Sequence, residues 1–343
     1  MAQKISQSSK LDFSNFLPSL FIIAFLLVGF VPNLDAVDKI APQWLYLSIL
    51  NFSSGIYLFY NRRTFTYRFF SVLSSAMTLS YIGFVMWALF SYFYAINPTE
   101  VLVNIVRHFN TLFMFINLGI FIYNIKNKAR LVSLSIMLIL SIEIYFVLVQ
   151  ALEMYNTSGL VDPGLLKGVT ANRNITAFSI AIKLPYVMFL VLSSKGSFFK
   201  IINSFIIFLG LFSLTMIESR ASFVAAGAVA ILLFFWTIYL SKREKSYKNL
   251  FANFYYLVPM ILALLTNQAL LKDKGSDALS RAATISLSTN DGSVNQRLRY
   301  YEDVLTHITK NPILGTGIGN WKLTSIDYDK EDINGYIVPY HAH

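Results

Sequence analysis

Three arginines and two histidines are the residues of this chain best suited to chemistry on a phosphorylated substrate. Arg297 and Arg299 lie in the stretch SVNQRLRYYEDVLTHITKNPILGTGIGNW, Arg220 lies in ESRAS at 218–222, and His341 and His343 end the sequence. A planar guanidinium fork matches phosphate oxygens, and a neutral imidazole accepts a proton near physiological pH. The set therefore indicates anion stabilisation by arginine beside proton removal by histidine.

The stretch after residue 293 predicts an amphipathic helix that separates its two arginines. Ser293 and Gln296 form a capping-box pattern, and Asn311-Pro312 ends the helix. The apolar residues recur at helical spacing: Val294, Leu298, Tyr301, Leu305 and Ile308. At about 100° per residue, Arg297 is about 50° and Arg299 about 150° from the centre of this stripe. We expect Arg297 to border the buried face and Arg299 to point to solvent.

Simpler roles compete with these assignments. Arg220 and Arg297 also fit arginines that snorkel to a membrane surface, with Glu218 as an ion-pair partner for Arg220. His341 and His343 lie at i, i+2, but no HExxH pattern, cysteine or acidic cluster accompanies them, so we expect no metal and no cofactor. The glycines at 315, 317 and 319 predict a tight turn, because a nucleotide-binding fingerprint needs a preceding strand and different spacing.

The elements that must position these residues are membrane spans. Of the 343 residues, 55% are hydrophobic and 13% charged, against about 25% charged in soluble domains. A span needs about 20 apolar residues. The sequence predicts an all-α polytopic membrane protein with about nine spans, at 15–33, 43–60, 70–91, 103–125, 131–151, 175–193, 201–218, 221–240 and 250–270.

The short loops predict how the spans are oriented. With the N-terminus inside, the inside segments hold most of the Lys and Arg residues of the loops, as the positive-inside rule requires. They include Arg62, Arg63, Arg68, Lys126, Lys128, Arg130, Lys242, Arg243 and Lys245. We therefore expect a transmembrane domain at 1–270 and an extracytoplasmic helical loop at 271–343. The sequence ends on His-Ala-His outside the membrane, which we expect to be a truncation. The net charge of +10 then reflects topology, and no nucleic-acid partner is expected.

Two ionisable residues fall inside predicted spans. Glu143 and Lys183 each lie about eight residues from the outer end of their span, at the same depth by a rise of 1.5 Å per residue. We expect them to pair as a stabilising contact, because an unpaired charge at that depth is costly. Asn172 and Asn174 are expected to line the cavity at the outer end.

Five patterns in order along the chain resemble the O-antigen ligase and O-antigen polymerase superfamily of bacterial transferases. They are SYFYAINP at 91–98, ANRNITAFSIAIKLP at 171–185, ESRASF at 218–223, QRLRYYEDVLTHITKNPILGTGIGN at 296–320 and the terminal HAH. The resemblance implies a metal-independent inverting glycosyltransferase that acts on undecaprenyl-diphosphate-linked glycans, without nucleotide sugars. It implies Arg220 and Arg297 as the arginines that face the diphosphate and bind substrate beside Asn174, and His343 as the base. His341 remains the alternative base. A truncated chain would be expected to be inactive.

The resemblance leaves several functions open. The acceptor is expected to be a glycan or a lipid-A core, which fits an O-antigen ligase at the outer face of the bacterial cytoplasmic membrane. A polymerase of O-antigen or exopolysaccharide and a protein O-oligosaccharyltransferase are alternatives within the superfamily. A transporter of the lipid-linked glycan is an alternative of another class, which would predict an inverted repeat and paired broken helices. The sequence has neither.

Overall fold

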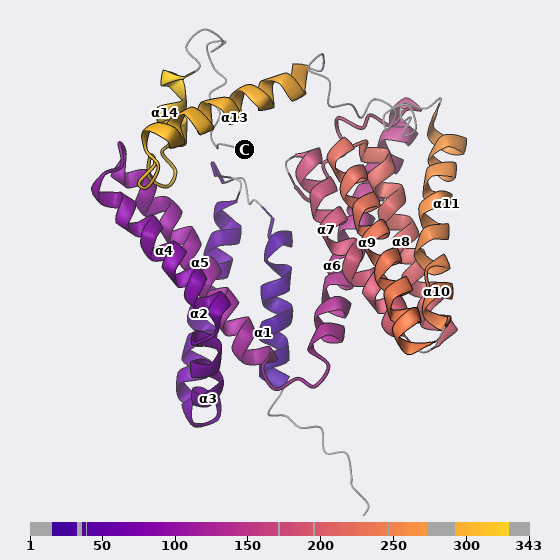
Figure 1. The fold of residues 1–343 in the computed structure, drawn as a ribbon, viewed down its shortest axis with the longest axis horizontal. Helices are drawn as coiled ribbons and strands as arrows, with labels where there is room; N and C mark the ends of the chain where they lie inside the picture. The colour runs from indigo at the N-terminus through magenta and orange to yellow at the C-terminus, as the bar shows by residue number, and fades with distance from the viewer. Residues whose placement is uncertain are drawn as a thin grey trace, which may run out of the picture. The chain divides into compact units, whose positions relative to one another are not determined.

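The computed structural model describes residues 16–32, 36–38, 40–170, 172–194, 196–245, 247–272 and 292–328. These residues form helices and connections without any strand (Figure 1), which confirms the predicted all-α class. The chain divides into two compact units. Unit 1 comprises Met1–Ile125 and Leu287–His343, and unit 2 comprises Lys126–Ser286. We describe each unit separately.

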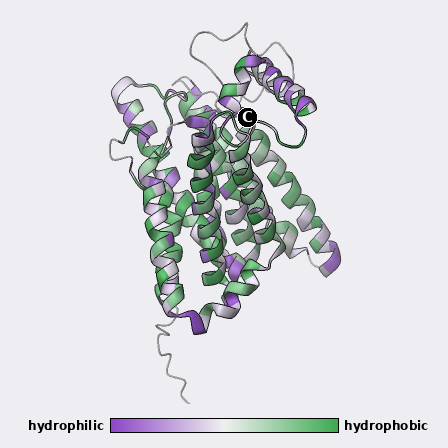
Figure 2. Ribbon diagram, turned by 90° about the vertical axis from the view of Figure 1, so that its left-hand side faces the viewer, coloured by the Kyte–Doolittle hydropathy of each residue, from purple (hydrophilic) through white to green (hydrophobic). Residues whose placement is uncertain are grey.

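Seven helical segments within the described ranges are long and apolar enough to cross a membrane, which confirms a polytopic membrane protein. Figure 2 shows hydrophobic residues along most of their lengths. They are Ala76–Phe93, Pro98–Ile122, Lys128–Ser158, Arg173–Ser193, Ser197–Ile217, Arg220–Arg243 and Phe254–Leu271. The predicted spans 15–33 and 43–60 are not among the seven, because the apolar helix Phe16–Phe30 is short and α2 carries Gln43, Asn51 and three serines.

Unit 1 is built around α5 (Pro98–Ile122), against which α2 (Ala41–Tyr60), α3 (Arg62–Leu73) and α4 (Ala76–Phe90) pack. The other elements are α1 (Phe16–Leu26), η2 (Leu27–Phe30), η3 (Ser91–Phe93), α13 (Gly292–Lys310), α14 (Trp321–Thr324) and η5 (Ser325–Asp327). In Figure 1, α13 lies crosswise beyond the ends of the helices of unit 1 and not alongside them. Buried side chains such as Phe25, Ile116 and Phe121 form the core between the spans.

A row of hydrogen bonds from amide and hydroxyl side chains joins α2 to α5, and we refer to this row as the ladder. Asn51 Nδ2 donates to the Asn110 carbonyl at 2.9 Å, and Asn117 Nδ2 donates to Ser54 Oγ at 2.8 Å. Ser48 Oγ donates to Asn110 Oδ1 at 3.1 Å. Such hydrogen bonds between spans contribute about 0.6 kcal/mol each on average. The polar side chains that lower the hydropathy of α2 are thus paired with polar groups of α5.

The third predicted span is broken into α3 and α4 at Ser74–Ser75. Ser75 caps α4 by accepting from Thr78 N at 3.3 Å, and Thr78 Oγ1 donates to the Val72 carbonyl at 2.7 Å. Side-chain hydroxyls thus satisfy backbone groups that the break would otherwise leave unpaired in an apolar setting.

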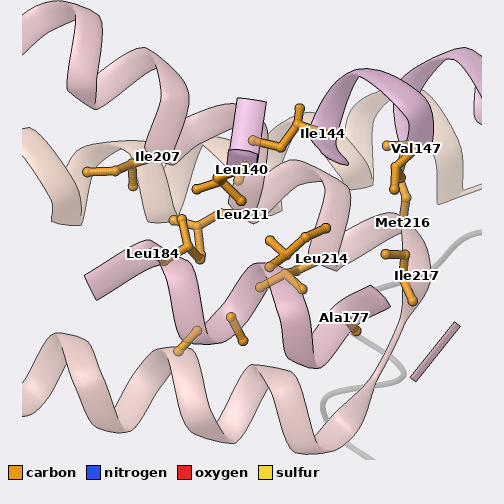
Figure 3. Packing of buried hydrophobic residues seen from close by; sticks show 14 of the residues in the cluster. Leu140, Ile144, Val147, Ala177, Leu184, Ile207, Leu211, Leu214, Met216 and Ile217 are labelled. Atoms are coloured by element: carbon orange, nitrogen blue, oxygen red, sulfur yellow. The ribbon is translucent and has the colours of Figure 1, made fainter. Parts of the chain in front are cut away.

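Unit 2 is a bundle of consecutive antiparallel helices. Its elements are α6 (Lys128–Ser158), α7 (Arg173–Ser193), α8 (Ser197–Ile217), α9 (Arg220–Glu244), α10 (Lys248–Phe251) and α11 (Phe254–Leu271). α8 packs most extensively, against both α7 and α11. Figure 3 shows the core between α6, α7 and α8, where Ile144, Leu184 and Leu214 converge.

Gly210 marks the closest approach in this core. A Cβ built there lies 3.0 Å from Leu184 Cδ2 and 3.4 Å from Ile144 Cδ1, whereas one built at Gly227 of α9 meets nothing within 4 Å. The absence of a side chain at Gly210 therefore sets the spacing between α8 and α7.

We predict that Gly210→Leu destabilises the protein by about 1–3 kcal/mol, because it overpacks a filled core. Gly227→Leu is the matched control and should leave stability unchanged or slightly raised, since leucine favours helix over glycine. Thermal unfolding of the purified proteins in detergent measures both. Equal midpoints for the two variants would contradict the close packing at Gly210.

Candidate functional site

A joint of glycines and asparagines holds the segment after α13 against the start of α5. Gly315, Gly317 and Gly319 all have positive φ, at 62°, 83° and 77°, the region that glycine enters without strain. A Cβ at Gly317 would lie 2.8 Å from Ala95 Cβ, and one at Gly319 would collide with the Asn104 amide. The turn predicted from the sequence therefore also requires close approach to unit 1 at two of its three glycines.

Asn320 is the fully buried centre of this joint. Its Oδ1 accepts from the Asn97 backbone N at 2.7 Å, and its Nδ2 donates to the Asn97 carbonyl at 3.3 Å. One amide side chain therefore satisfies both polar groups of a residue 223 positions away. The Asn97 side chain in turn caps α5 by accepting from Thr99 N at 3.1 Å.

Further contacts surround this pair. Ile318 N donates to Ser91 Oγ at 3.1 Å, and Lys322 Nζ pairs with Glu100 Oε1 at 2.6 Å. Tyr94 OH donates to the Leu314 carbonyl at 2.7 Å. Burial raises the pKa of the Tyr94 phenol, which keeps it protonated as that donor. The patterns at 91–98 and 315–320 thus form one structure, a relation that the sequence analysis did not detect.

The orientation of α13 differs from the sequence prediction. Leu298, Tyr301, Leu305 and Ile308, expected to be buried, are 41%, 45%, 61% and 48% exposed. Tyr300 and His307 are buried instead. Arg299, expected to point to solvent, is half-buried with its Nε enclosed. We refer to the four exposed residues as the apolar stripe of α13.

The aromatic residues that follow α13 explain this orientation. His307 Nδ1 lies 3.0 Å from Tyr328 OH, and the His307 ring meets Trp321 edge-on at a centroid distance of 5.9 Å. Trp321 also stacks on Tyr328. A helical wheel compares the faces of α13 by hydropathy alone. It does not include the segment with Trp321 and Tyr328 as a packing partner.

Arg297 lies within the second turn of α13, next to Leu298 and four residues before Tyr301, and its side chain is outside the described part. By backbone register it is at the edge of the apolar stripe. His341 and His343 also lie outside the described residues, so their roles stay predictions. Within the described ranges, no group of three or more His, Asp or Glu residues is arranged to hold a metal ion.

Arg220 is the first residue of α9 in unit 2, and only Glu218 and Ser219 separate α9 from α8. Glu218 adopts a left-handed conformation with φ 55°, which is strained for a residue with a Cβ and typical of tightly constrained turns. Arg220 is half-buried. Its guanidinium adds to the positive end of the α9 dipole, so the position favours an anion.

Asn174 is the second residue of α7 and lies at the same end of unit 2, since α6 to α9 alternate in direction. Its backbone N donates to the cap Asn172 Oδ1 at 2.8 Å, and its side chain is exposed. Gln150 Oε1 fixes the preceding loop by accepting from Lys167 N at 3.0 Å and Gly168 N at 2.9 Å. This end of the unit therefore presents an ordered polar surface.

The predicted pair of Glu143 and Lys183 is confirmed. Lys183 Nζ lies 2.8 Å from Glu143 Oε1 and 2.9 Å from Oε2, between α6 and α7. Ser179 Oγ donates to the same carboxylate at 2.9 Å. The carboxylate is 9% exposed, so the pair joins two spans within the apolar part of the bundle.

We predict that Lys183→Met lowers the stability of the protein by about 3–5 kcal/mol, because it leaves a buried carboxylate without its partner. Combining it with Glu143→Gln should restore most of the loss, since no net charge then stays buried. Thermal unfolding of both single variants and the double variant gives the coupling. Additive losses would exclude an energetic link between the two residues.

We predict that Gly317→Ala destabilises the joint more than Gly315→Ala. Both substitutions place alanine at positive φ at a cost of about 1 kcal/mol, but only Gly317 faces a neighbouring Cβ at 2.8 Å. Limited proteolysis of the segment after α13, followed by mass spectrometry, reports the release of the joint. Equal cleavage rates in the two variants would contradict the close contact with Ala95.

Comparison with known proteins adds a match over the part of the chain that begins in α8. Residues 205–343 match the family model described as O-antigen ligase. This range includes Arg220, Arg297, His341, His343 and the glycine joint. Neither the curated proteins nor the solved structures contain a match to the chain.

Proposed function

Because the match over residues 205–343 supports membership of the O-antigen ligase superfamily, we propose that the protein transfers a glycan from undecaprenyl diphosphate to an acceptor sugar hydroxyl. The proposed site of transfer is the outer face of the bacterial cytoplasmic membrane. The acceptor is a glycan or a lipid-A core. The single observation that carries this proposal is the family match over the segment that holds both arginines and both histidines.

The position of α13 supports a reaction at a membrane surface. The helix runs across the ends of the spans of unit 1 (Figure 1) and turns its apolar stripe away from its packing partners. Ile313 and Leu314, next in the chain, are also exposed, as are Phe93 and Ile96 beside the joint. An exposed apolar face continuous with lipid-facing residues is typical of a helix that lies in the membrane interface.

This placement would bring Arg297 to the depth of the diphosphate. The residue lies at the edge of the apolar stripe by backbone register, where a long basic side chain extends toward the head groups. The diphosphate of a polyprenyl carrier lies at that level, with its hydrocarbon in the bilayer. The snorkelling role considered for Arg297 and its substrate-binding role are therefore compatible.

The proposed reaction is a single displacement. The acceptor oxygen attacks the anomeric carbon from the face opposite the diphosphate, and the bond from that carbon to the diphosphate oxygen breaks with inversion. Undecaprenyl diphosphate departs with the electron pair. His343, with His341 as the alternative, takes the proton of the acceptor hydroxyl. Arg220 and Arg297 stabilise the charge that develops on the leaving group. The proposed reaction needs neither a metal ion nor a nucleotide sugar.

Other activities of the superfamily remain candidates on the same residues. A polymerase or a protein O-oligosaccharyltransferase would differ in the acceptor and keep the donor chemistry. A transporter of the lipid-linked glycan is less well supported, because the arginines and histidines gather in extramembrane segments and not at the bilayer midplane.

We predict that Arg220→Ala, Arg297→Ala and His343→Ala each lower the rate of transfer by about 10²-fold or more, because each removes a group used in the transition state. His341→Ala tests the alternative base. The measurement is glycan transfer from a polyprenyl-diphosphate donor in proteoliposomes. Arg130→Ala, which changes an exposed arginine in the first turn of α6, is the control. Normal turnover in all three variants would refute the mechanism.

We predict that a fluorophore at Leu305 is quenched by nitroxide-labelled lipids and that one at Thr306 is quenched much less. Both residues are exposed, and Leu305 lies on the apolar stripe whereas Thr306 lies about 100° further round the helix. The chain contains no cysteine, so a single cysteine can be labelled at each position. If the label at Leu305 is shielded from water but not quenched by the nitroxide-labelled lipids, protein and not lipid covers the apolar stripe.

A further inference from the structure

Unit 1 contains a lateral groove that the proposed transfer reaction does not use. Its volume is about 1110 Å³, larger than the 300–1,000 Å³ of ordinary small-molecule pockets. α2 and α3 form its two walls and α5 its floor, with Ile82 contributed by α4. It therefore has room for long flexible chains.

The walls of the groove are hydrocarbon and aromatic. Phe52, Phe59, Phe70 and Phe113 line it and are 72%, 67%, 61% and 51% exposed. Gly55 also lines it, and a Cβ at that position meets nothing within 4 Å. In a membrane-spanning unit, such an open and mainly apolar channel is filled by lipid chains and not by water.

The polar residues along the groove are already paired with one another. Ser48, Asn51 and Asn110 belong to the ladder between α2 and α5, and Asn117 donates to Ser54. Because these amides and hydroxyls are hydrogen-bonded within the protein, they need no polar ligand deep in the groove. The occupant must be apolar over most of its length.

One end of the groove is basic. Arg62 lines it at the tight turn between α2 and α3, Arg63 follows directly, and no acidic side chain is among the described lining residues. Arg68 on the same helix has a protein partner, since the Asn124 amide oxygen accepts from its Nη2 at 2.7 Å and its Nε at 3.1 Å. The Arg62 guanidinium lies over the ring of Phe59, 5.7 Å from its centroid. Its guanidinium thus remains suited to a phosphate.

We propose that this groove binds an anionic phospholipid, with its acyl chains between α2 and α3 and its phosphate at Arg62 and Arg63. The basic end is at the opposite end of α4 and α5 from the joint of Asn97 and Asn320. The lipid belongs to the leaflet on the far side of the membrane from the proposed transfer face, and by the positive-inside rule that leaflet is cytoplasmic. The polyprenyl-diphosphate donor, with its glycan on the transfer face, does not fit this polarity.

Native mass spectrometry of the purified protein tests the proposal by comparing binding of phosphatidylglycerol with binding of phosphatidylcholine. We expect the wild-type protein to retain phosphatidylglycerol preferentially. Gly55→Phe should abolish retention, because it fills the open wall. Arg62→Ala with Arg63→Ala should reduce the preference by roughly tenfold or more, since each basic residue near a membrane surface contributes about 1 kcal/mol to anionic lipid binding.

Two matched controls separate the groove from general effects. Gly227→Phe places the same side chain at an equally open glycine of α9 in unit 2, and Arg130→Ala removes an exposed arginine of α6 in unit 2. Arg130 is not among the lining residues of the groove, and both variants should bind phosphatidylglycerol as the wild type does. Undiminished retention by Gly55→Phe, or no preference between the two lipids in the wild type, would overturn the proposal. Displacement of phosphatidylglycerol by polyprenyl diphosphate would assign the groove to the donor instead. None of these readouts requires transfer activity.

Discussion

The hydrogen bonds between Asn320 and the backbone of Asn97 are the contact on which the extramembrane part of unit 1 depends. A single buried amide replaces the water that both polar groups of Asn97 would otherwise need, and leaving such groups unpaired costs about 1–3 kcal/mol each. Because the glycines at 317 and 319 have no side chain, the backbone comes near enough for these bonds to form. The direction of α13 follows from this anchor at one side and from the packing of His307 on Tyr328 at the other.

In unit 2, a pair of charged side chains holds two helices together. Glu143 and Lys183 fix α6 against α7 within the apolar bundle, and Ser179 completes the coordination of the carboxylate. In the same bundle, the two-residue link of Glu218 and Ser219 joins α8 to α9 directly before Arg220. The start of α9 fixes the position of Arg220 within unit 2, whereas the position of Arg297 follows from how α13 packs within unit 1.

The sequence predicted the features that depend on local patterns and on depth. Hydropathy located the spans from α4 to α11, and counting residues from the span ends paired Glu143 with Lys183. Two kinds of feature could not be predicted from the sequence. The face on which α13 packs depends on Trp321 and Tyr328, which a hydropathy wheel of the helix excludes. The contact of Asn320 with Asn97 joins segments that no local pattern relates, although a buried asparagine after three glycines was the available signal. α2 was predicted as a span on apolar content, but its Asn51 hydrogen-bonds to the partner helix α5.

Unit 1 is discontinuous in the chain, and this has a consequence for biosynthesis. α5 leaves the ribosome long before Asn320, which follows Asn97 by 223 residues. At about 5–20 residues per second, roughly 10–45 s pass before the second partner exists. All of unit 2 is translated in that interval. The N-terminal helices must therefore remain in the membrane with the Asn97 peptide group open to water until the segment that carries Asn320 has been made.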